Sequence, residues 1–405
     1  MVVGFLVGVW VARYLGPAKF GLLSFARSFV GLFMALSTLG LDPIVVRELV
    51  KDESKMDVLL GTSFFLKLIG ATVAVTCASV AIYFTSTDTL TRLMVLIIAF
   101  SLIFQAFNVI DLYFQSKVIS KFSVLAQIFS TILSAIVKII LILEHASLIY
   151  FAAAGVFDMI TIGAGYIYFY YKTNNLPLNR WKFELSCAKI LLKDSWPLIL
   201  SGVAIGIYMK IDQVMIKYIL NDRAVGLYSA AVRLCEVWYV IPAVITGSLF
   251  PAIINAKKIS KKLYYERLQR LYSLMVWTAI TISVIFSLTS NFLVKLLYGE
   301  AYVQSRNVLS IYIWITVFVF IGVAFSKYLI VEDYTQKALY RTSLGAIINI
   351  GLNLLLISKY GIVGAAYATL TAQFIANYGY DFLDSDLRKY IGLKLKCFNP
   401  YYIVK

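Results

Sequence analysis

Ionisable side chains occur inside stretches of sequence that are otherwise apolar enough to cross a membrane. These residues are Arg27, Lys67, Lys138, Asp158, Lys210, Asp212 and Arg233. A charged group at bilayer depth is costly, so it usually faces an internal cavity and marks a binding site or an ion path. The sequence therefore predicts a protein that works from within the membrane, with these side chains directed toward a central cavity.

The composition is that of an integral membrane protein. Hydrophobic residues make up 61% of the 405 residues and charged residues only 14%, far from the balance of a soluble domain. The apolar stretches are about 20 residues long, the length of a spanning helix, whereas the strands of an outer-membrane barrel alternate over about ten residues. We therefore predict an all-α, polytopic helical bundle.

Apolar stretches between charged or Gly/Pro breaks predict about twelve membrane helices. They lie near residues 2–14, 20–41, 58–84, 91–114, 122–143, 147–171, 196–219, 225–253, 272–296, 306–331, 338–357 and 361–381. The first is shorter than the roughly 20 residues of a span, which favours a natural start upstream or a fragment. A cleavable signal peptide is the competing interpretation, but no basic segment precedes this apolar run.

The distribution of Lys and Arg predicts the orientation. Most basic residues outside the spans lie in the connections after every second helix and in the C-terminal tail. Short basic loops stay in the cytoplasm, so both termini are predicted to be cytoplasmic. The cluster Lys257, Lys258, Lys261 and Lys262 then indicates contact with anionic lipid rather than with nucleic acid.

The chain repeats itself once. Phe20-Gly-Leu-Leu-Ser-Phe-Ala is similar to Val225-Gly-Leu-Tyr-Ser-Ala-Ala, at the starts of the second and eighth predicted helices. Both copies cross the membrane in the same direction, which predicts a parallel repeat of six helices plus six around a central cavity. We predict an N-terminal lobe (1–171), a cytoplasmic linker (172–195), a C-terminal lobe (196–381) and a cytoplasmic tail (382–405).

Motifs along nearly the whole chain resemble the polysaccharide-biosynthesis, or O-antigen, flippase family. They are the run from Val11 to Ala26, Leu39-Gly-Leu-Asp-Pro, Lys210-Ile-Asp-Gln, Val225-Gly-Leu-Tyr-Ser-Ala-Ala and Tyr360-Gly-Ile-Val-Gly-Ala-Ala. That family belongs to the superfamily of multidrug and toxin extruders and lipid II flippases, with twelve or more helices in two lobes. The resemblance implies transfer of an undecaprenyl-pyrophosphate-linked oligosaccharide from the cytoplasmic to the outer leaflet of the bacterial cytoplasmic membrane. It also implies a polysaccharide polymerase and a chain-length protein as partners.

An anionic lipid-linked sugar needs a wet, cationic cavity, because its glycan and pyrophosphate cannot cross hydrocarbon unaided. The candidate residues for binding this substrate are Arg27, Lys67, Lys210, Arg233, Asn349 and Asn353. The two asparagines share a helix face, where their amides suit sugar hydroxyls, although hydrogen bonding between helices explains them equally well.

Structural alternatives exist for the charged residues. Glu236 follows Arg233 by three residues on the same helix face, so the two could form an internal ion pair. Asp158 and Asp212 are candidates for coupling to a proton or sodium ion, with structural pairing to a neighbouring helix as the alternative. Lys138 is expected to extend its ammonium group toward the membrane surface.

Two other functional classes are considered. A multidrug extruder for organic cations should place carboxylates in its cavity and has little use for Arg27 and Arg233. A membrane polymerase or ligase would be expected to present its catalytic groups on a sizeable external loop, which the predicted topology lacks. The sequence has no phosphate-binding loop of the Gly-x-x-x-x-Gly-Lys-(Ser/Thr) kind, and we predict neither a cofactor nor a metal site.

Overall fold

The computed structural model describes residues 2–174, 178–332, 334–388, 390–399 and 401. Within these ranges the chain is helical, and ten helical stretches are long and apolar enough to cross a membrane. Helices of this kind satisfy their backbone hydrogen bonds internally, as the hydrocarbon region requires. The prediction of an all-α, multi-pass membrane bundle is confirmed.

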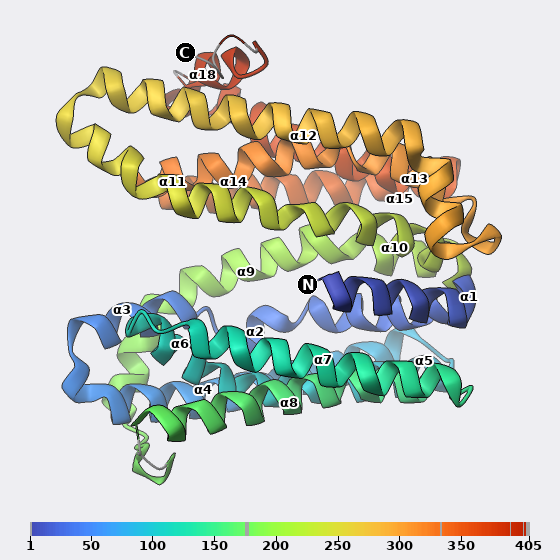
Figure 1. Cartoon of the computed structure of the whole chain (residues 1–405), viewed down its shortest axis with the longest axis horizontal. Helices are drawn as coiled ribbons and strands as arrows, with labels where there is room; N and C mark the ends of the chain where they lie inside the picture. The colour runs from blue at the N-terminus through green and yellow to red at the C-terminus, as the bar shows by residue number, and fades with distance from the viewer. Residues whose placement is uncertain (1, 175–177, 333, 389, 400, 402–405) are drawn as a thin grey trace. The chain divides into compact units, whose positions relative to one another are not determined.

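Most of the helices are labelled in Figure 1. Their bounds are α1 Val2–Gly31, α2 Met34–Thr38, α3 Asp42–Lys51, α4 Met56–Thr85, α5 Thr89–Phe104, α6 Val109–Ser116, α7 Lys121–Leu143, α8 Leu148–Asn174, α9 Leu185–Ile219, α10 Asp222–Glu236, α11 Val240–Ile259, α12 Lys261–Tyr298, α13 Ser305–Tyr312, α14 Ile315–Val331, α15 Thr335–Phe374, α16 Tyr380–Leu383, α17 Ser385–Arg388 and α18 Ile391–Lys396. A π-helix, Ile375–Gly379, joins α15 to α16.

The stretch Gln336–Leu383 contains two of the predicted spans, and Val2–Gly31 contains the first predicted span and the beginning of the second. Gly16 interrupts α1 with φ 71° and ψ 169°, and Gly361 interrupts α15 with φ 60° and ψ −141°. Glycine adopts positive φ without the steric cost that a Cβ atom imposes. Gly16 falls in the predicted break at residues 15–19, and Gly361 directly follows the predicted break at residues 358–360.

The chain forms two compact units, of which unit 1 comprises Met1–Leu15 and Leu22–Ile211. Helix α4 packs on α5, α5 on α8, and α7 on α8 (Figure 1). Buried apolar side chains from α3, α4, α6 and α8 form its main core. Helix α9 begins at Leu185, so the last part of the predicted linker is already helical and continuous with the predicted seventh span.

Unit 2 comprises Gly16–Gly21 and Asp212–Lys405. Helix α12 packs against α11, α13 and α14, and α15 packs against α13 and α14. Its core is built from α12, α14 and the C-terminal segment, with Tyr272, Phe320 and Tyr328 almost fully buried. The relation of two six-helix lobes by a parallel repeat stays a prediction.

The equivalent glycines of the two repeat motifs contact each other within unit 2. A Cβ atom on Gly21 would collide with the carbonyl oxygen of Asp222, and one on Gly226 with the carbonyl oxygen of Pro17. Asp222 precedes Gly226 by four residues, and Pro17 precedes Gly21 by four, so the contact is reciprocal. Glycine at these positions lets two helix backbones approach closely.

Alanine at Gly226 should therefore destabilise the protein. The added methyl group has no room between the two backbones, and overpacking of this kind typically costs about 1–3 kcal/mol. Unfolding of the purified protein in a denaturing detergent measures the loss. Gly247→Ala is the matched control, because that helical glycine has nothing within 4 Å of its Cβ position; equal effects of the two substitutions would contradict the close contact.

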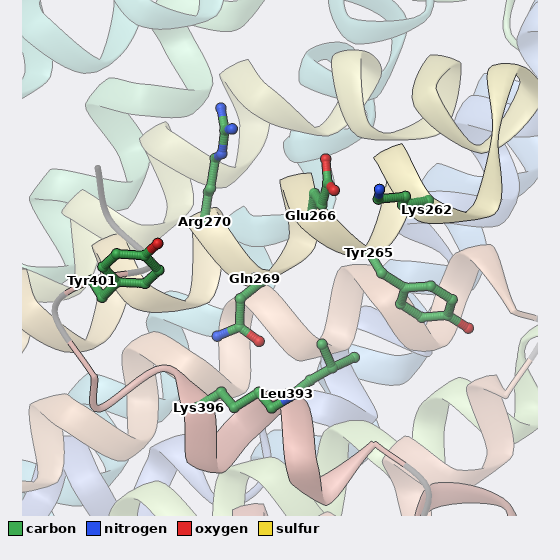
Figure 2. Close-up of a pocket in the computed structure, with 8 residues that line it drawn as sticks. All are labelled: Lys262, Tyr265, Glu266, Gln269, Arg270, Leu393, Lys396 and Tyr401. Carbon is green, nitrogen blue, oxygen red and sulfur yellow. The ribbon is translucent and has the colours of Figure 1, made fainter. Parts of the chain in front are cut away.

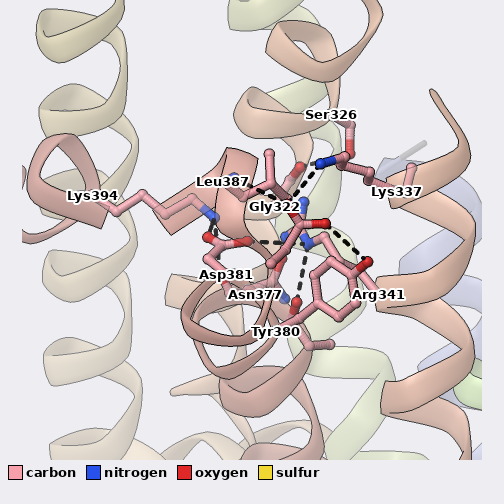
Figure 3. A network of polar contacts seen from close by, with 12 residues as sticks. Gly322, Ser326, Lys337, Arg341, Asn377, Tyr380, Asp381, Leu387 and Lys394 are labelled. Atoms are coloured by element: carbon pink, nitrogen blue, oxygen red, sulfur yellow. Dashed lines mark hydrogen bonds and ion pairs between the residues drawn. The ribbon is translucent and has the colours of Figure 1, made fainter. Parts of the chain in front are cut away.

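Buried charges hold the C-terminal segment, helices α16 to α18, against the rest of unit 2 (Figure 3). Lys394 of α18 is fully buried, forms an ion pair with Asp381 and donates to the carbonyl oxygen of Asn377 at 2.7 Å. Arg341 of α15 donates to the Asn377 side-chain oxygen at 2.8 Å. The Lys394 ammonium lies 3.4 Å from the centre of the Phe325 ring, a cation–π contact. Burial and the nearby Arg341 lower the pKa of Lys394, while Asp381 opposes that shift.

Replacement of Asp381 with asparagine should destabilise this segment strongly. The change leaves Lys394 and Arg341 buried without their carboxylate, a loss that typically costs about 3–5 kcal/mol. Asp386→Asn is the control, because Asp386 is half exposed and shares Lys337 with Asp384, so its loss should cost less than about 1 kcal/mol. Detergent unfolding and limited proteolysis of the C-terminal segment measure both; a weaker effect at Asp381 than at Asp386 would contradict this assignment.

Candidate functional site

A buried carboxylate in unit 2 brings together side chains from three helices. Asp212 comes from the last part of α9, Tyr228 from α10, and Asn349, Asn353 and Thr369 from α15. The two asparagines lie one helical turn apart before the break at Gly361, and Thr369 lies after it. The change of direction at that glycine allows Thr369 to face the asparagines that precede it by 16 and 20 residues.

Both oxygen atoms of Asp212 accept hydrogen bonds. Oδ1 accepts from the Asn353 amide at 2.6 Å, and Oδ2 accepts from the hydroxyls of Tyr228 at 2.7 Å and Thr369 at 2.5 Å. The Asn349 amide donates to Thr369 Oγ1 at 3.3 Å. Asp212 is only 2% exposed and both asparagines are fully buried. The cluster is therefore a closed polar site inside an apolar unit.

Asp212 has no basic side chain within ion-pair distance among the residues that the structure describes. A buried ionised carboxylate without a cation is costly, so it favours either a proton or a bound cation. Asn353 Oδ1 is buried and has no hydrogen-bond donor, and carboxylate and amide oxygens are the ligands that hard cations prefer. The chemistry of this cluster suits reversible binding of a proton or a small cation.

A close seam between α9 and the α1–α2 region lies in unit 1. A Cβ atom on Gly202 would lie 3.0 Å from Ala35 Cβ, and one on Gly206 would lie 3.5 Å from the Gly31 carbonyl oxygen. From the first contact to the second, the residue number rises by four along α9 and falls by four along the α1–α2 region. The two segments therefore run antiparallel. Small residues at these positions allow the helices to approach closely.

Helix periodicity predicts that two cations lie at the same level one turn further along this seam. Lys210 follows Gly206 by four residues, and Arg27 precedes Gly31 by four, so each lies one turn further along the shared face. The Lys210 side chain indeed lies against α1, because a Cβ atom on Gly31 would be 3.5 Å from Lys210 Cγ. Arg27 is exposed and Lys210 is partly buried. We therefore expect Arg27 and Lys210 to lie close together on this face of unit 1, and we call this pair the Arg27–Lys210 site; both residues belong to candidate membrane helices.

The other cations have different surroundings. Lys67 is 2% exposed and forms a 2.5 Å ion pair with Asp42, whose carboxylate is half exposed. Lys138 pairs with Asp158 at 2.7 Å and also donates to Ser134, so its ammonium turns to a neighbouring helix instead of the membrane surface.

Arg233 is partly buried on α10 in unit 2. The predicted pairing of Arg233 with Glu236 stays a prediction, as do the functional roles of all these residues.

Residues 1–257 match the family described as "Polysaccharide biosynthesis protein". The match covers more than half of the chain and includes the motifs at Val11, Leu39, Lys210 and Val225. The chain belongs to the polysaccharide biosynthesis protein family. The predicted family resemblance is therefore confirmed.

Known proteins similar to this family member include one curated sequence and several solved structures. The curated relative is named "Putative O-antigen transporter", from Shigella flexneri, and is 23% identical over 205 residues. The match covers 49% of this chain and 47% of that protein, so it spans about half the length of the curated relative.

Two solved structures superpose with a TM-score of 0.75 at 15% identity. One is an inward-facing multidrug resistance MATE family transporter of the MOP superfamily, with 98% of this chain and 95% of that chain covered. The other is the lipid II flippase MurJ in an inward closed conformation, with 98% and 88% covered. At this identity the likeness establishes that this member of the family has the same fold as those transporters.

Sequence reasoning identified only part of the Asp212 cluster. Asp212 and Asn353 were predicted for different roles, ion coupling and sugar binding, whereas the structure joins them by a hydrogen bond. Tyr228 was visible as the fourth residue of the second repeat motif, where the first copy has Leu23. Thr369 carried no signal, because a lone threonine in a membrane helix usually bonds to its own backbone.

Proposed function

We propose that this protein translocates an undecaprenyl-pyrophosphate-linked oligosaccharide, such as an O-antigen, capsule or exopolysaccharide repeat unit, by alternating access. The direction is from the cytoplasmic to the outer leaflet of the bacterial cytoplasmic membrane, with both termini of the chain in the cytoplasm. Membership of the polysaccharide biosynthesis family supports the class of cargo, and the shared fold supports a transport mechanism.

The observation that carries this proposal is the position of the Lys210 side chain against α1 at Gly31, one helical turn from Arg27. A pyrophosphate is a strong hydrogen-bond acceptor with high negative charge, and Arg and Lys are the side chains that bind such groups. Two cations at one level of a membrane seam suit this ligand, whereas a transporter of organic cations would place carboxylates there. Arg27 and Lys210 are assigned to the pyrophosphate, with Arg233 as a further contact to acidic groups of the cargo.

The remaining candidates receive different roles. Lys67 reaches the cargo only when its ion pair with Asp42 opens, and Asp42 is exposed enough for that exchange. Asn349 and Asn353 are fully buried beside Asp212, so we assign their amides to the ion site and not to sugar hydroxyls. Asp212 then couples transport to a proton or sodium ion; Asp158, which has Lys138 as partner, is the second candidate for that role.

Deletion of the gene in its host tests the proposed cargo and step. Surface polysaccharide and the lipid-linked oligosaccharide on the inner leaflet are quantified in the same cells. Loss of surface polysaccharide together with accumulation of the lipid-linked oligosaccharide supports flipping. Re-expression of the chain should return both quantities to their wild-type levels. Unchanged glycans together with increased sensitivity to cationic drugs would contradict the proposal and favour a small-molecule extruder.

A further inference from the structure

The N-terminal end of α12 and the C-terminal residues 393–401 line a pocket that belongs to neither the Asp212 site nor the Arg27–Lys210 site. Its volume is about 560 Å³. Lys262, Glu266, Gln269 and Arg270 of α12 line one wall, and Lys396 of α18 contributes to the other (Figure 2). Lys262, Glu266 and Arg270 recur every four residues and share one helix face, and Gln269 lies on the adjoining face.

The pocket carries an excess of positive charge. Three basic side chains, Lys262, Arg270 and Lys396, line it with a single carboxylate, Glu266. Within the described residues, Lys262 and Lys396 form no ion pair. A cavity lined by three basic side chains and one carboxylate favours an anionic ligand, and phosphate oxygens are strong acceptors for both Lys and Arg.

Gln269 adds a second, independent indication of a ligand. Gln269 is buried, with only 6% of its surface exposed. Figure 2 shows its side chain directed from α12 toward the α18 side of the pocket. Gln269 Oε1 has no hydrogen-bond donor, and its amide nitrogen makes only a long contact of 3.4 Å with Ser273. A buried acceptor without a partner is costly, and a ligand hydroxyl would supply the missing donor.

The predicted start of the membrane span in α12 puts this pocket near the membrane boundary. The predicted span in α12 begins at residue 272, so the pocket lies within about three helical turns of that boundary. Tyr265 and Tyr401 also line it, and tyrosine is typical of the headgroup level. The α18 side of the pocket is held in place by the buried ion pair between Lys394 and Asp381. The pocket is therefore part of the packed structure of unit 2.

We propose that this pocket binds a phosphate ester that carries hydroxyl groups, such as the phosphoglycerol headgroup of an anionic phospholipid. Lys262, Arg270 and Lys396 contact the phosphate, and Gln269 accepts a hydrogen bond from a hydroxyl. Binding here is independent of the proposed transport function, because none of these residues belongs to the sites assigned to the cargo or the ion.

Binding to the purified full chain tests this proposal. The probes are dioctanoyl phosphatidylglycerol, dioctanoyl phosphatidic acid, dioctanoyl phosphatidylcholine and soluble glycerol phosphate, each measured by titration and native mass spectrometry. Dioctanoyl phosphatidylglycerol should bind more tightly than dioctanoyl phosphatidylcholine. Binding of soluble glycerol phosphate as well would show that the headgroup alone suffices, whereas binding of the lipid alone would assign the membrane as the source; both results support the site.

Matched variants separate the pocket from a diffuse basic surface. The double variant Lys262→Gln/Lys396→Gln should weaken phosphatidylglycerol binding by about tenfold or more, because each charge-assisted hydrogen bond contributes substantially. Lys258→Gln/Lys261→Gln removes the same charge from exposed neighbours outside the pocket and should change affinity by less than about threefold. Equal loss in the two double variants would overturn the proposal.

Gln269→Met tests the hydroxyl contact. It should reduce the preference for phosphatidylglycerol over phosphatidic acid, which has no headgroup hydroxyls, without loss of phosphatidic acid binding. An unchanged preference would overturn the assigned role of Gln269.

Discussion

Replacing Asp212 with asparagine should abolish ion-coupled export while leaving the protein at least as stable as the wild type. The carboxylate is buried and has no basic partner among the described residues, so its charge is costly unless a proton or cation is bound. Asparagine keeps the shape and one acceptor oxygen but removes the charge. Export should fall by at least about tenfold, measured as surface polysaccharide per unit of protein in the membrane.

Ligand-dependent stability provides the second readout for Asp212. A cation that binds the native state stabilises it, by about 2.7 kcal/mol when its concentration is 100 times Kd. The melting temperature of the wild type should therefore rise with sodium concentration if sodium is the coupling ion, or change with pH if a proton is. The Asp212→Asn variant should show neither dependence.

Asp158→Asn is the matched control for this experiment. Asp158 is also a membrane carboxylate, but it pairs with Lys138 at 2.7 Å, and its loss leaves a partly buried ammonium without its partner. The control should lose about 1–3 kcal/mol of unfolding free energy and keep the ion dependence of its stability. If the stability of Asp212→Asn still depended on the ion, or that of Asp158→Asn no longer did, Asp212 would not be the coupling residue.

The double variant Arg27→Gln/Lys210→Gln should show the second large effect. Each charge-assisted hydrogen bond to a phosphate contributes about 1.5–3 kcal/mol, which is about tenfold or more in affinity for each residue. Export should fall below detection while the protein remains folded in the membrane, because Arg27 is exposed and Lys210 only partly buried. Complementation of the deletion strain, with parallel measurement of protein level, gives the result.

Charge-conserving variants define what the two cations do. Arg27→Lys and Lys210→Arg keep the charge and should retain most of the export if the site acts mainly through electrostatic attraction. Greater loss in Arg27→Lys than in Lys210→Arg would indicate bidentate binding by the guanidinium group. Normal export in the double glutamine variant would remove this site from the mechanism.

The sequence predicted the spans well because the membrane imposes a strong and local constraint on composition. The breaks within α1 and α15 were also predicted closely: Gly16 lies in the predicted gap at 15–19, and Gly361 directly follows the gap at 358–360. The seventh span, predicted at 196–219, was less accurate: α9 begins at Leu185, within the predicted linker 172–195. A helix can extend beyond the hydrocarbon region, and composition does not mark where it ends.

Contacts between distant segments were much harder to predict. Asp212 and Thr369 are 157 residues apart, and Lys394 was placed in a polar tail although it is fully buried against Asp381. The ion pair of Lys138 with Asp158 depends on the packing of α7 on α8. Periodicity shows which residues share a helix face, but it does not show which helix that face meets.

Reconstitution of the purified chain tests the central claim most directly. A fluorescent undecaprenyl-pyrophosphate oligosaccharide is incorporated into proteoliposomes, and its transfer between leaflets is followed with a glycosidase that cannot cross the membrane. We predict protein-dependent transfer that requires Arg27 and Lys210 and is driven by an ion gradient only when Asp212 is present. Transfer no faster than in protein-free liposomes under every proton and sodium gradient would contradict the account.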